Sequence, residues 1–192
     1  MAKNGLIGLQ GLHIAKRDDL GQVEQDSTMK VDGMVKASCE INMVSSSFYC
    51  DDAVADTFTS FADGTVTIEL LGLSMEEYAL LTGATLEKGI VIDDINTVAP
   101  NLTMTFRSQM LDGKFRYVCF PLVKAKINGE EFTTKEDGVE IANVTAEFAI
   151  IPMDGKWRVR ADEGSKELPI GFIDGFLTSF PTEIPGATKA TK

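Results

Sequence analysis

The chain has 192 residues, of which 44% are hydrophobic and 24% are charged, a composition typical of one globular domain rather than of a disordered or membrane-spanning chain. Its three cysteines, Cys39, Cys50 and Cys119, are widely spaced and form no CxxC pair, which argues against a disulfide framework or a zinc site. The N-terminal segment lacks a continuous apolar core and a cleavage site, so we expect no signal peptide and folding in a cytoplasm.

The charge is unevenly distributed. The formal net charge is −11, and no Lys or Arg occurs between Ala37 and Glu87. A protein that binds nucleic acid sequence-specifically gathers basic side chains on one face, whereas this chain gathers acidic ones, which argues against that function class. The simplest interpretation of the acidic stretch is a solvated surface that aids solubility.

Glycines alternate with apolar side chains at the N-terminus, over residues 5–14. This segment is too apolar to move freely in water, yet too rich in glycine for a good interior strand. We expect residues 11–16 to form the first strand of the domain. Residues 1–10 either extend that strand or form an arm that contacts a neighbouring subunit, and the contacting side chains would be Leu6, Ile7 and Leu9.

Short segments farther along the chain alternate polar and apolar residues with the period of a β-strand. These predicted strands cover residues 65–70, 114–118, 145–150 and 156–160. Pairs that favour tight hairpin turns lie beside them: Asp63-Gly64, Asp112-Gly113, Asn128-Gly129 and Asp154-Gly155. Because alternation buries one face of a strand and leaves the other wet, the pattern predicts a mainly β fold of packed antiparallel sheets. Trp157, in the last strand, is expected in the core.

One helix is clearly marked between the first two of these strands. Ser74 and Glu77 have the spacing of a capping box, and Gly83 is placed to end the helix. We expect its inner face to consist of Met75, Tyr78, Ala79 and either Leu81 or Thr82. A helix of about two turns is not stable alone, so it must lie against the sheets.

A second, short helix is predicted near the C-terminus, over residues 170–180. Its apolar side chains recur at i, i+3, i+4 and i+7, at Ile173, Phe176, Leu177 and Phe180. Two glycines within it weaken the helix by about 1 kcal/mol each, and a proline ends it. The residues beyond it, 181–192, are expected to form a loose tail.

The sequence contains few candidates for catalytic residues. His13 is the only histidine and stands between apolar residues, with no nucleophile motif in the chain. Neighbouring acidic residues on a strand point in opposite directions, so the acidic doublets do not form a paired-carboxylate site. Asp51 and Asp56 lack the spacing of an EF-hand, and no phosphate-binding glycine loop is present. We therefore expect no enzyme activity, no cofactor and no metal.

Five segments resemble, in order, the major tail proteins of siphophages that infect Gram-positive bacteria. They are GLIGLQGLHIAK from Gly5, YCDD from Tyr49, SFADGTVTIELLGLSMEEYALLTGAT from Ser60, DGKFRYVCF from Asp112 and FAIIPMDGKWRVRADE from Phe148. The resemblance covers residues 5–163. Each segment is weakly specific alone, and their common order makes the combination specific.

The resemblance implies a structural virion protein with a tail-tube fold: two packed antiparallel sheets, a flanking helix, an N-terminal arm and a long loop. Members of this family form hexameric rings that stack into a hollow tube through which phage DNA passes, and they carry no cofactor. The tail-tube domain would span residues 1–163, with a C-terminal extension over 164–192. Other copies of the chain, the tape-measure protein and other tail proteins would be its partners, with DNA only as transient cargo and no membrane. The acidic side chains Asp51, Asp52, Asp56 and Asp63 would then line the lumen and repel DNA.

Three alternatives remain. A tube protein of a contractile injection or secretion system would share the fold and the rings. A monomeric β-sandwich that binds a ligand such as a sugar or calcium would require an exposed aromatic platform. An enzyme has the least support from the motifs.

Overall fold

A computed structural model of the protein describes residues 5–50, 53–127 and 143–183. Eight strands form one antiparallel sheet in the order β2-β1-β7-β8-β9-β4-β3, with β10 paired to β8. The mainly β fold with a flanking helix is confirmed. The sheet consists of β1 (Leu6–Lys16), β2 (Met29–Val31), β3 (Met34–Cys50), β4 (Ala53–Leu70), β7 (Leu102–Met110), β8 (Phe115–Ile127), β9 (Val144–Ile150) and β10 (Val159–Asp162).

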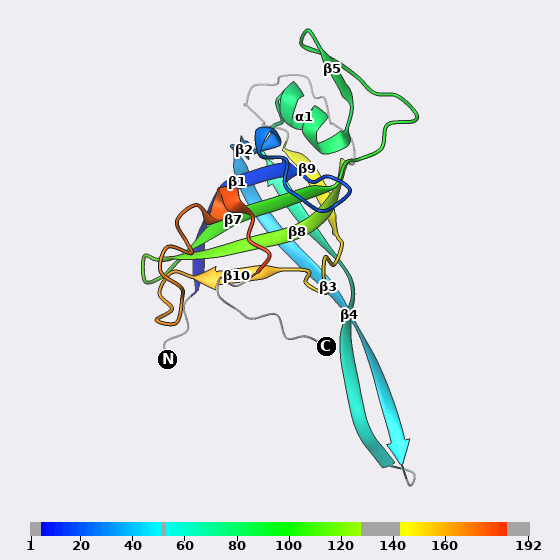
Figure 1. Ribbon diagram of the computed structural model, residues 1–192, viewed down its shortest axis with the longest axis vertical. Helices are drawn as coiled ribbons and strands as arrows, with labels where there is room; N and C mark the ends of the chain where they lie inside the picture. Colours follow the sequence, from blue (N-terminus) through cyan, green and yellow to red (C-terminus); the bar gives the residue numbers. More distant parts are fainter. Residues whose placement is uncertain (1–4, 51–52, 128–142, 184–192) are drawn as a thin grey trace, which may run out of the picture.

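The remaining elements are small. A separate two-stranded sheet contains β5 (Thr85–Glu87) and β6 (Ile90–Ile92). The helices are α1 (Met75–Thr82), α2 (Phe176–Ser179) and the 3-10 turn η1 (Gln25–Ser27). In Figure 1, α1 and β5 lie at one end of the long axis, and the tip of the β3–β4 hairpin lies at the other.

The long strand β8 joins the two layers into one folded sheet. One edge of β8 pairs with β7, while its other edge pairs first with β10 and then, from Val123, with β9. The β1, β7 and β8 strands therefore cross in front of β3 and β4 (Figure 1). Apolar side chains of both layers meet between them in the main core, which includes Leu12, Met104, Phe120, Ile68 and Phe148.

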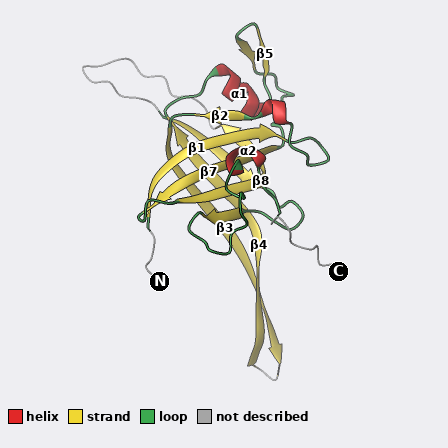
Figure 2. Ribbon diagram, turned by 60° about the vertical axis from the view of Figure 1, so that its left-hand side comes forward, coloured by secondary structure: helices red, strands yellow, loops and turns green. Residues whose placement is uncertain are grey.

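A second apolar cluster covers the outer face of β8. Tyr117 and Cys119 point outward from this strand, and Phe176 and Phe180 of the C-terminal segment pack on them. Figure 2 shows α2 lying over the β7–β8 layer. The part of the C-terminal extension that the structure describes, residues 164–183, is thus held against the sheet. The expected loose tail lies mostly beyond the described residues.

The predicted helix over 170–180 is much shorter than expected. Only Phe176–Ser179 is helical, because Gly171 and Gly175 adopt left-handed backbone conformations, with φ of 78° and 81°. The apolar spacing nevertheless identified side chains that pack against the sheet, since Phe176 and Phe180 are both buried. Burial of these side chains therefore does not require a continuous helix.

The helix α1 begins and ends as predicted. The Ser74 hydroxyl accepts a hydrogen bond from the Glu77 N–H, and the Glu77 carboxylate accepts one from the Ser74 N–H. Gly83 follows the helix with φ of 80°. The prediction of its inner face was partly wrong. Met75 was expected on this face but is 59% exposed, and Leu80 was not expected there but is buried. Burial is concentrated in the second half of α1, so the first turn extends beyond the sheet.

Two of the four predicted hairpin turns are present, one lies outside the described residues, and one is wrong. Gly113, with φ of 83°, joins β7 to β8 as expected, and Asp154-Gly155 forms a two-residue turn with both φ values positive. The predicted strand over 156–160 is wrong in its bounds, because only a single bridge joins Met153 to Lys156 before β9 and β10 diverge. Asn128-Gly129 lies outside the described residues.

The predicted turn at Asp63-Gly64 is wrong, because both residues lie inside β4. A bulge at the neighbouring Ala62 shifts the register between β3 and β4. A Cβ atom at Gly64 would lie 2.9 Å from the Glu40 carbonyl oxygen. The glycine is therefore required by close contact between two strands and not by a turn.

Candidate assembly surface

The hairpin of β3 and β4 is the longest element of the molecule, and its outer part projects from the body (Figures 1 and 2). β4 pairs with β9 only through Thr65–Leu70. Beyond this point, within the described residues, the two strands of the hairpin pair only with each other. We call this outer part, residues 42–50 and 53–63, the distal hairpin. A two-stranded ribbon of this kind is at best marginally stable in water by itself.

The face of the hairpin that carries apolar side chains changes at the point where the ribbon leaves the body. Inside the sheet, the inward face carries core side chains such as Ala37 and Ile68, and the outward face carries polar ones such as the Lys36–Glu69 ion pair at 3.1 Å. Beyond the Met43–Phe61 pair, the continuation of the inward face is a hydroxyl ladder. Its cross-strand hydrogen bonds join Ser45 to Thr59 at 3.2 Å and Ser47 to Thr57 at 3.1 Å.

The continuation of the outward face carries apolar side chains among polar ones. Val44, Phe48 and Phe58 lie on it, because side chains two residues apart share a face of a strand. Phe48 and Phe58 are 59% and 61% exposed, and their rings meet edge to face at 5.8 Å. The distal hairpin therefore exposes aromatic side chains that, in the described residues of this chain, contact mainly each other.

A stack of side chains supports the base of the distal hairpin. The ring of Trp157, from the segment before β10, lies parallel to that of Phe61, and the Arg158 guanidinium lies 4.3 Å from the Trp157 ring centroid. Arg158 also approaches the thiol of Cys39 at 3.8 Å. Partial burial raises the pKa of this thiol and lowers the pKa of Arg158. Trp157 is partly buried against the core, as expected, but its contact with Phe61 could not be predicted from spacing.

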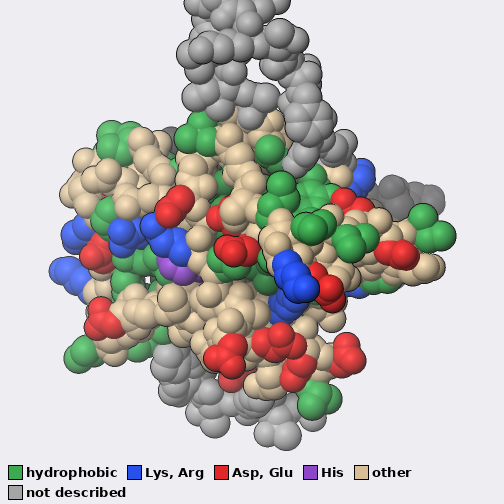
Figure 3. Space-filling view, turned by 90° about the horizontal axis from the view of Figure 1, so that it is seen from above, with side chains coloured by type: hydrophobic (Ala, Val, Ile, Leu, Met, Phe, Trp, Pro, Cys, Tyr) green, Lys and Arg blue, Asp and Glu red, His purple; other side chains and the backbone are tan. Residues whose placement is uncertain are grey.

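A second exposed apolar surface lies at the opposite end of the molecule. It consists of Ile90, Ile92, Ile95 and Val98, which are 55–99% exposed, and we call it the isoleucine ridge. It follows α1 in the chain, and Figure 3 looks onto this end and shows hydrophobic and acidic side chains close together. This surface was missed in the sequence, because the three residues of β6 and the separate apolar residues after it are too few to show a period.

The N-terminal residues expected to contact a neighbouring subunit belong to β1. Residues Leu6–Gln10 pair with β7, so they extend the first strand. Leu6 and Ile7 are 52% and 61% exposed, while Leu9 packs against the main core. The exposed Leu111 lies at the same edge, where its N–H donates to the Gly5 carbonyl. Two of the three candidate residues are thus free for contact with another molecule.

The acidic residues expected in the lumen belong to the distal hairpin where the structure describes them. Asp56 is exposed and lies opposite Phe48. Asp63 is exposed as well, and its carboxylate accepts a hydrogen bond from the Asn42 amide. Asp51 and Asp52 lie outside the described residues.

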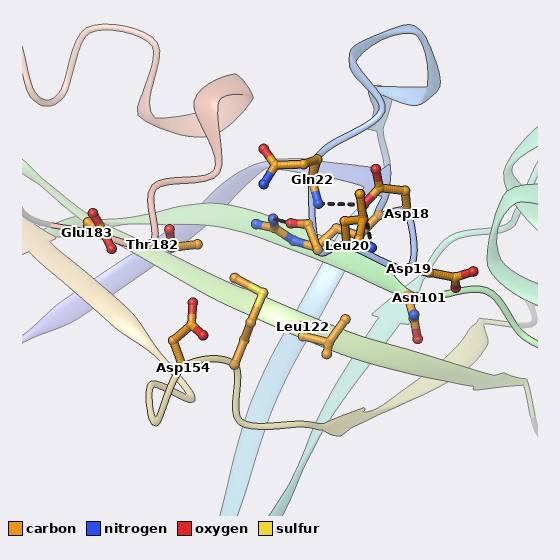
Figure 4. A pocket seen from close by; sticks show the side chains of 12 residues that line it. Asp18, Asp19, Leu20, Gln22, Asn101, Leu122, Asp154, Thr182 and Glu183 are labelled. Carbon is orange, nitrogen blue, oxygen red and sulfur yellow. Dashed lines mark hydrogen bonds between the residues drawn. The ribbon is translucent and has the colours of Figure 1, made fainter.

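A cavity of about 510 Å³ lies between the turn after β1, β8 and the Asp154 turn (Figure 4). Its most buried charged group is Arg17, which donates to the carbonyls of Pro121 and Gly21 and to the Thr103 hydroxyl. The Asp18 carboxylate accepts hydrogen bonds from two backbone N–H groups of the same turn. These hydrogen bonds of Arg17 and Asp18 hold the turn after β1 in place.

The single histidine has a local structural contact. The Nδ1 atom of His13 lies 3.0 Å from the Gly11 carbonyl, within a bulge of β1. Over the described ranges, no three His, Cys, Asp or Glu side chains gather as a metal site would require. None of the helices in those ranges has the length and apolar character needed to cross a membrane.

Comparisons with known proteins do not assign a family. No protein-family model matches the chain, and no curated protein matches it significantly.

Proposed function

We propose that this protein is a tail-tube subunit of a long-tailed phage. In this role it assembles with copies of itself into rings, hexameric by the resemblance, which stack into the hollow tube that delivers DNA. It would be located in the virion and would contact the tape-measure protein and other tail proteins. DNA would pass only as transient cargo.

The observation that carries the proposal is the distal hairpin. It has exposed Phe48 and Phe58 on one face and pairs with no other strand among the described residues. Exposed apolar surface on a projecting ribbon favours association and is a hazard unless it is covered. A second copy of the chain would cover it. The tail-tube resemblance implies a long loop, and the distal hairpin is our candidate for that loop.

Free strand edges support the formation of rings. Within the described residues, β2 and β3 are the two ends of the main sheet order. A ring requires a heterologous interface that closes by rotation, whereas stacking requires a second interface that remains open. Leu6 and Ile7 add exposed apolar area at the N-terminal edge. The chain thus has separate candidate surfaces for the two kinds of contact.

Negative-stain microscopy and sedimentation of the purified protein test the proposal. We expect rings or tubes of uniform diameter, formed without added cofactor. A protein that sediments as a monomer at every concentration, with no rings or tubes, would contradict it.

The acidic hairpin residues remain candidates for the lumen. A wall with acidic side chains would repel the phosphate backbone and let DNA slide, whereas basic walls would bind it. Both residues lie on the outward face, but Asp63 lies at the base of the hairpin opposite Asn42, whereas Asp56 lies beside Phe48 in the part that we expect to be covered. Asp63 therefore suits this role better than Asp56.

Two alternatives are less well supported. A tube protein of a contractile system would use the same surfaces, and the neighbouring genes would distinguish it. A monomeric ligand-binding module would require an exposed aromatic platform. Trp157 does not provide one, because its ring stacks on Phe61 and is covered by Arg158, and we assign the exposed pair of Phe48 and Phe58 to subunit contact.

A further inference from the structure

We infer that the outward, apolar face of the distal hairpin packs on the isoleucine ridge of the next copy, head to tail. The contact would place Val44, Phe48 and Phe58 of one copy against Ile90, Ile92 and Ile95 of another. The inference rests on the proposed function and deepens it, because it names the two surfaces that stack.

The outward face is the one to be covered, because the apolar side chains move from the inward face to the outward face along the hairpin. If the distal hairpin stood alone in water, neither face would need to be apolar. If it continued the core of its own domain, the inward face would be apolar, as it is at Ile41. Instead, the inward face becomes a hydroxyl ladder and the outward face becomes aromatic. The molecule that covers the ribbon therefore lies on its outward side.

The choice of partner surface follows from the shape of the molecule. The distal hairpin and the β5–β6 end lie at opposite ends of the long axis (Figure 1). Two different surfaces at opposite ends make a heterologous contact, which repeats without closing when the copies stack. The isoleucine ridge is also apolar, with Ile95 99% exposed and Ile90 64% exposed. Joining the two surfaces removes both from water.

Charge at the two surfaces agrees with this pairing. The hairpin has no cation, because Lys and Arg are absent from Ala37 to Glu87. Lys88 is the next basic residue in the chain, and it lies exposed in the turn between β5 and β6. It offers a partner for Asp56, which lies beside the aromatic pair. The acids of the ridge have local partners, since Asp93 accepts from the Tyr78 hydroxyl and Asp94 from the Asn96 N–H.

Crosslinking between single-cysteine variants tests the contact. In a background with Cys39→Ser and Cys50→Ser, Ser46→Cys places a thiol on the apolar face between Val44 and Phe48, and Ile92→Cys places one on the ridge. Assembled mixtures of the two variants are treated with a short bis-maleimide. We expect crosslinked dimers from the mixture and few from either variant alone, because the contact joins two different surfaces.

Ser47→Cys provides the matched control, because its side chain lies on the hydroxyl face one residue away. Mixed with Ile92→Cys, it should give much less dimer than Ser46→Cys gives. Equal yields from Ser46→Cys and Ser47→Cys, in a protein that forms tubes, would overturn the inference and leave the proposed function intact. Absence of tubes from the unmodified protein would overturn both.

A second pair of variants does not depend on cysteine chemistry. Phe58→Ser should raise the protein concentration needed for tube growth by at least about tenfold, as expected for an aromatic anchor of an interface. Thr59→Ala, on the other face, should leave that concentration unchanged. Circular dichroism establishes that both variants are folded. If Phe58→Ser is folded and grows tubes at the normal concentration, the apolar face is not the stacking surface.

Discussion

The indole ring of Trp157 stacks on the phenyl ring of Phe61, with ring centroids 5.0 Å apart and 13° between the ring planes. This contact joins the segment before β10 to the first residue pair of the hairpin beyond the bulge at Ala62. It is the point where the body of the protein holds the projecting ribbon. The direction of the ribbon therefore depends on residues almost 100 positions apart in the chain.

Replacing Trp157 by Ala should loosen the base of the hairpin. We expect a loss of about 1–3 kcal/mol in the free energy of unfolding, less than for a fully buried aromatic residue, because Trp157 is only partly buried. Denaturant titration measures the loss, and hydrogen exchange should be faster at residues 41–45. Trp157→Phe, which keeps a stacking ring, is the control. Unchanged exchange in this segment of Trp157→Ala would show that the stack does not support the hairpin.

Replacing Gly64 by Ala should destabilise the sheet. The new methyl group would lie 2.9 Å from both the Glu40 carbonyl oxygen and the Ile41 Cδ1 atom, and overpacking of this kind costs about 1–3 kcal/mol. The matched control is Gly72→Ala, where no atom lies within 4 Å and the change should stay below about 0.5 kcal/mol. Thermal melting of the two variants compares them. Equal melting temperatures would contradict the close contact.

Gly155 tests backbone strain without crowding. Its φ is 73°, and a Cβ atom added at this position would meet no other atom within 4 Å. Gly155→Val should cost about 1 kcal/mol or more, because a β-branched residue avoids the left-handed conformation. Gly155→Asn should cost less, since Asn tolerates it. If Val and Asn have the same effect on the unfolding free energy, the turn has another conformation in solution.

The thiol of Cys119 should make the protein less stable in alkaline solution. Burial raises the pKa of Cys119 from 9.0 to about 12, so the folded protein retains a proton that the unfolded chain loses. The stabilisation is fully present below pH 9 and is lost as the pH rises towards 12, by up to about 1.4 kcal/mol per pH unit.

Cys119→Ala removes this thiol and provides the comparison. The free energy of unfolding of the unmodified protein should fall more steeply between pH 9 and pH 11 than that of the variant. In the native protein at pH 8, a thiol reagent should modify the exposed Cys39 and Cys50 but not Cys119. Parallel pH profiles of the two proteins would contradict the buried thiol.

Charge reversal at Asp56 and Asp63 separates the lumen from the stacking surface. Both side chains are exposed, so exchange for Lys should change stability by less than about 0.5 kcal/mol. If Asp63 lines the lumen, Asp63→Lys should leave tube formation normal and slow DNA ejection. Raising the ionic strength should then restore ejection, because salt of ~0.15 M already screens charges beyond about 8 Å. Asp56→Lys should instead hinder tube growth, because Asp56 lies beside Phe48 on the proposed stacking face. Normal tube growth by Asp56→Lys would argue against that position.

The sequence by itself determined the features that depend on neighbouring residues. The Ser74–Glu77 capping box, the end of α1 at Gly83 and the turns at Gly113 and Gly155 are all as predicted, because capping and turn conformation involve only a few adjacent residues. Period-two alternation likewise indicated the mainly β class. These signals do not depend on which strands become neighbours.

The tertiary structure decided where each of these elements packs. Asp63-Gly64 has the pattern of a turn, yet the close approach of Glu40 places it inside β4. The spacing of Phe176 and Phe180 is that of a helix, but the outer face of β8 buries both side chains around a single helical turn. The two faces of the hairpin also exchange roles where β4 leaves β9, and only the pairing of the strands defines that position. Burial depends on contacts between distant segments, and local patterns along the chain do not encode which segments meet.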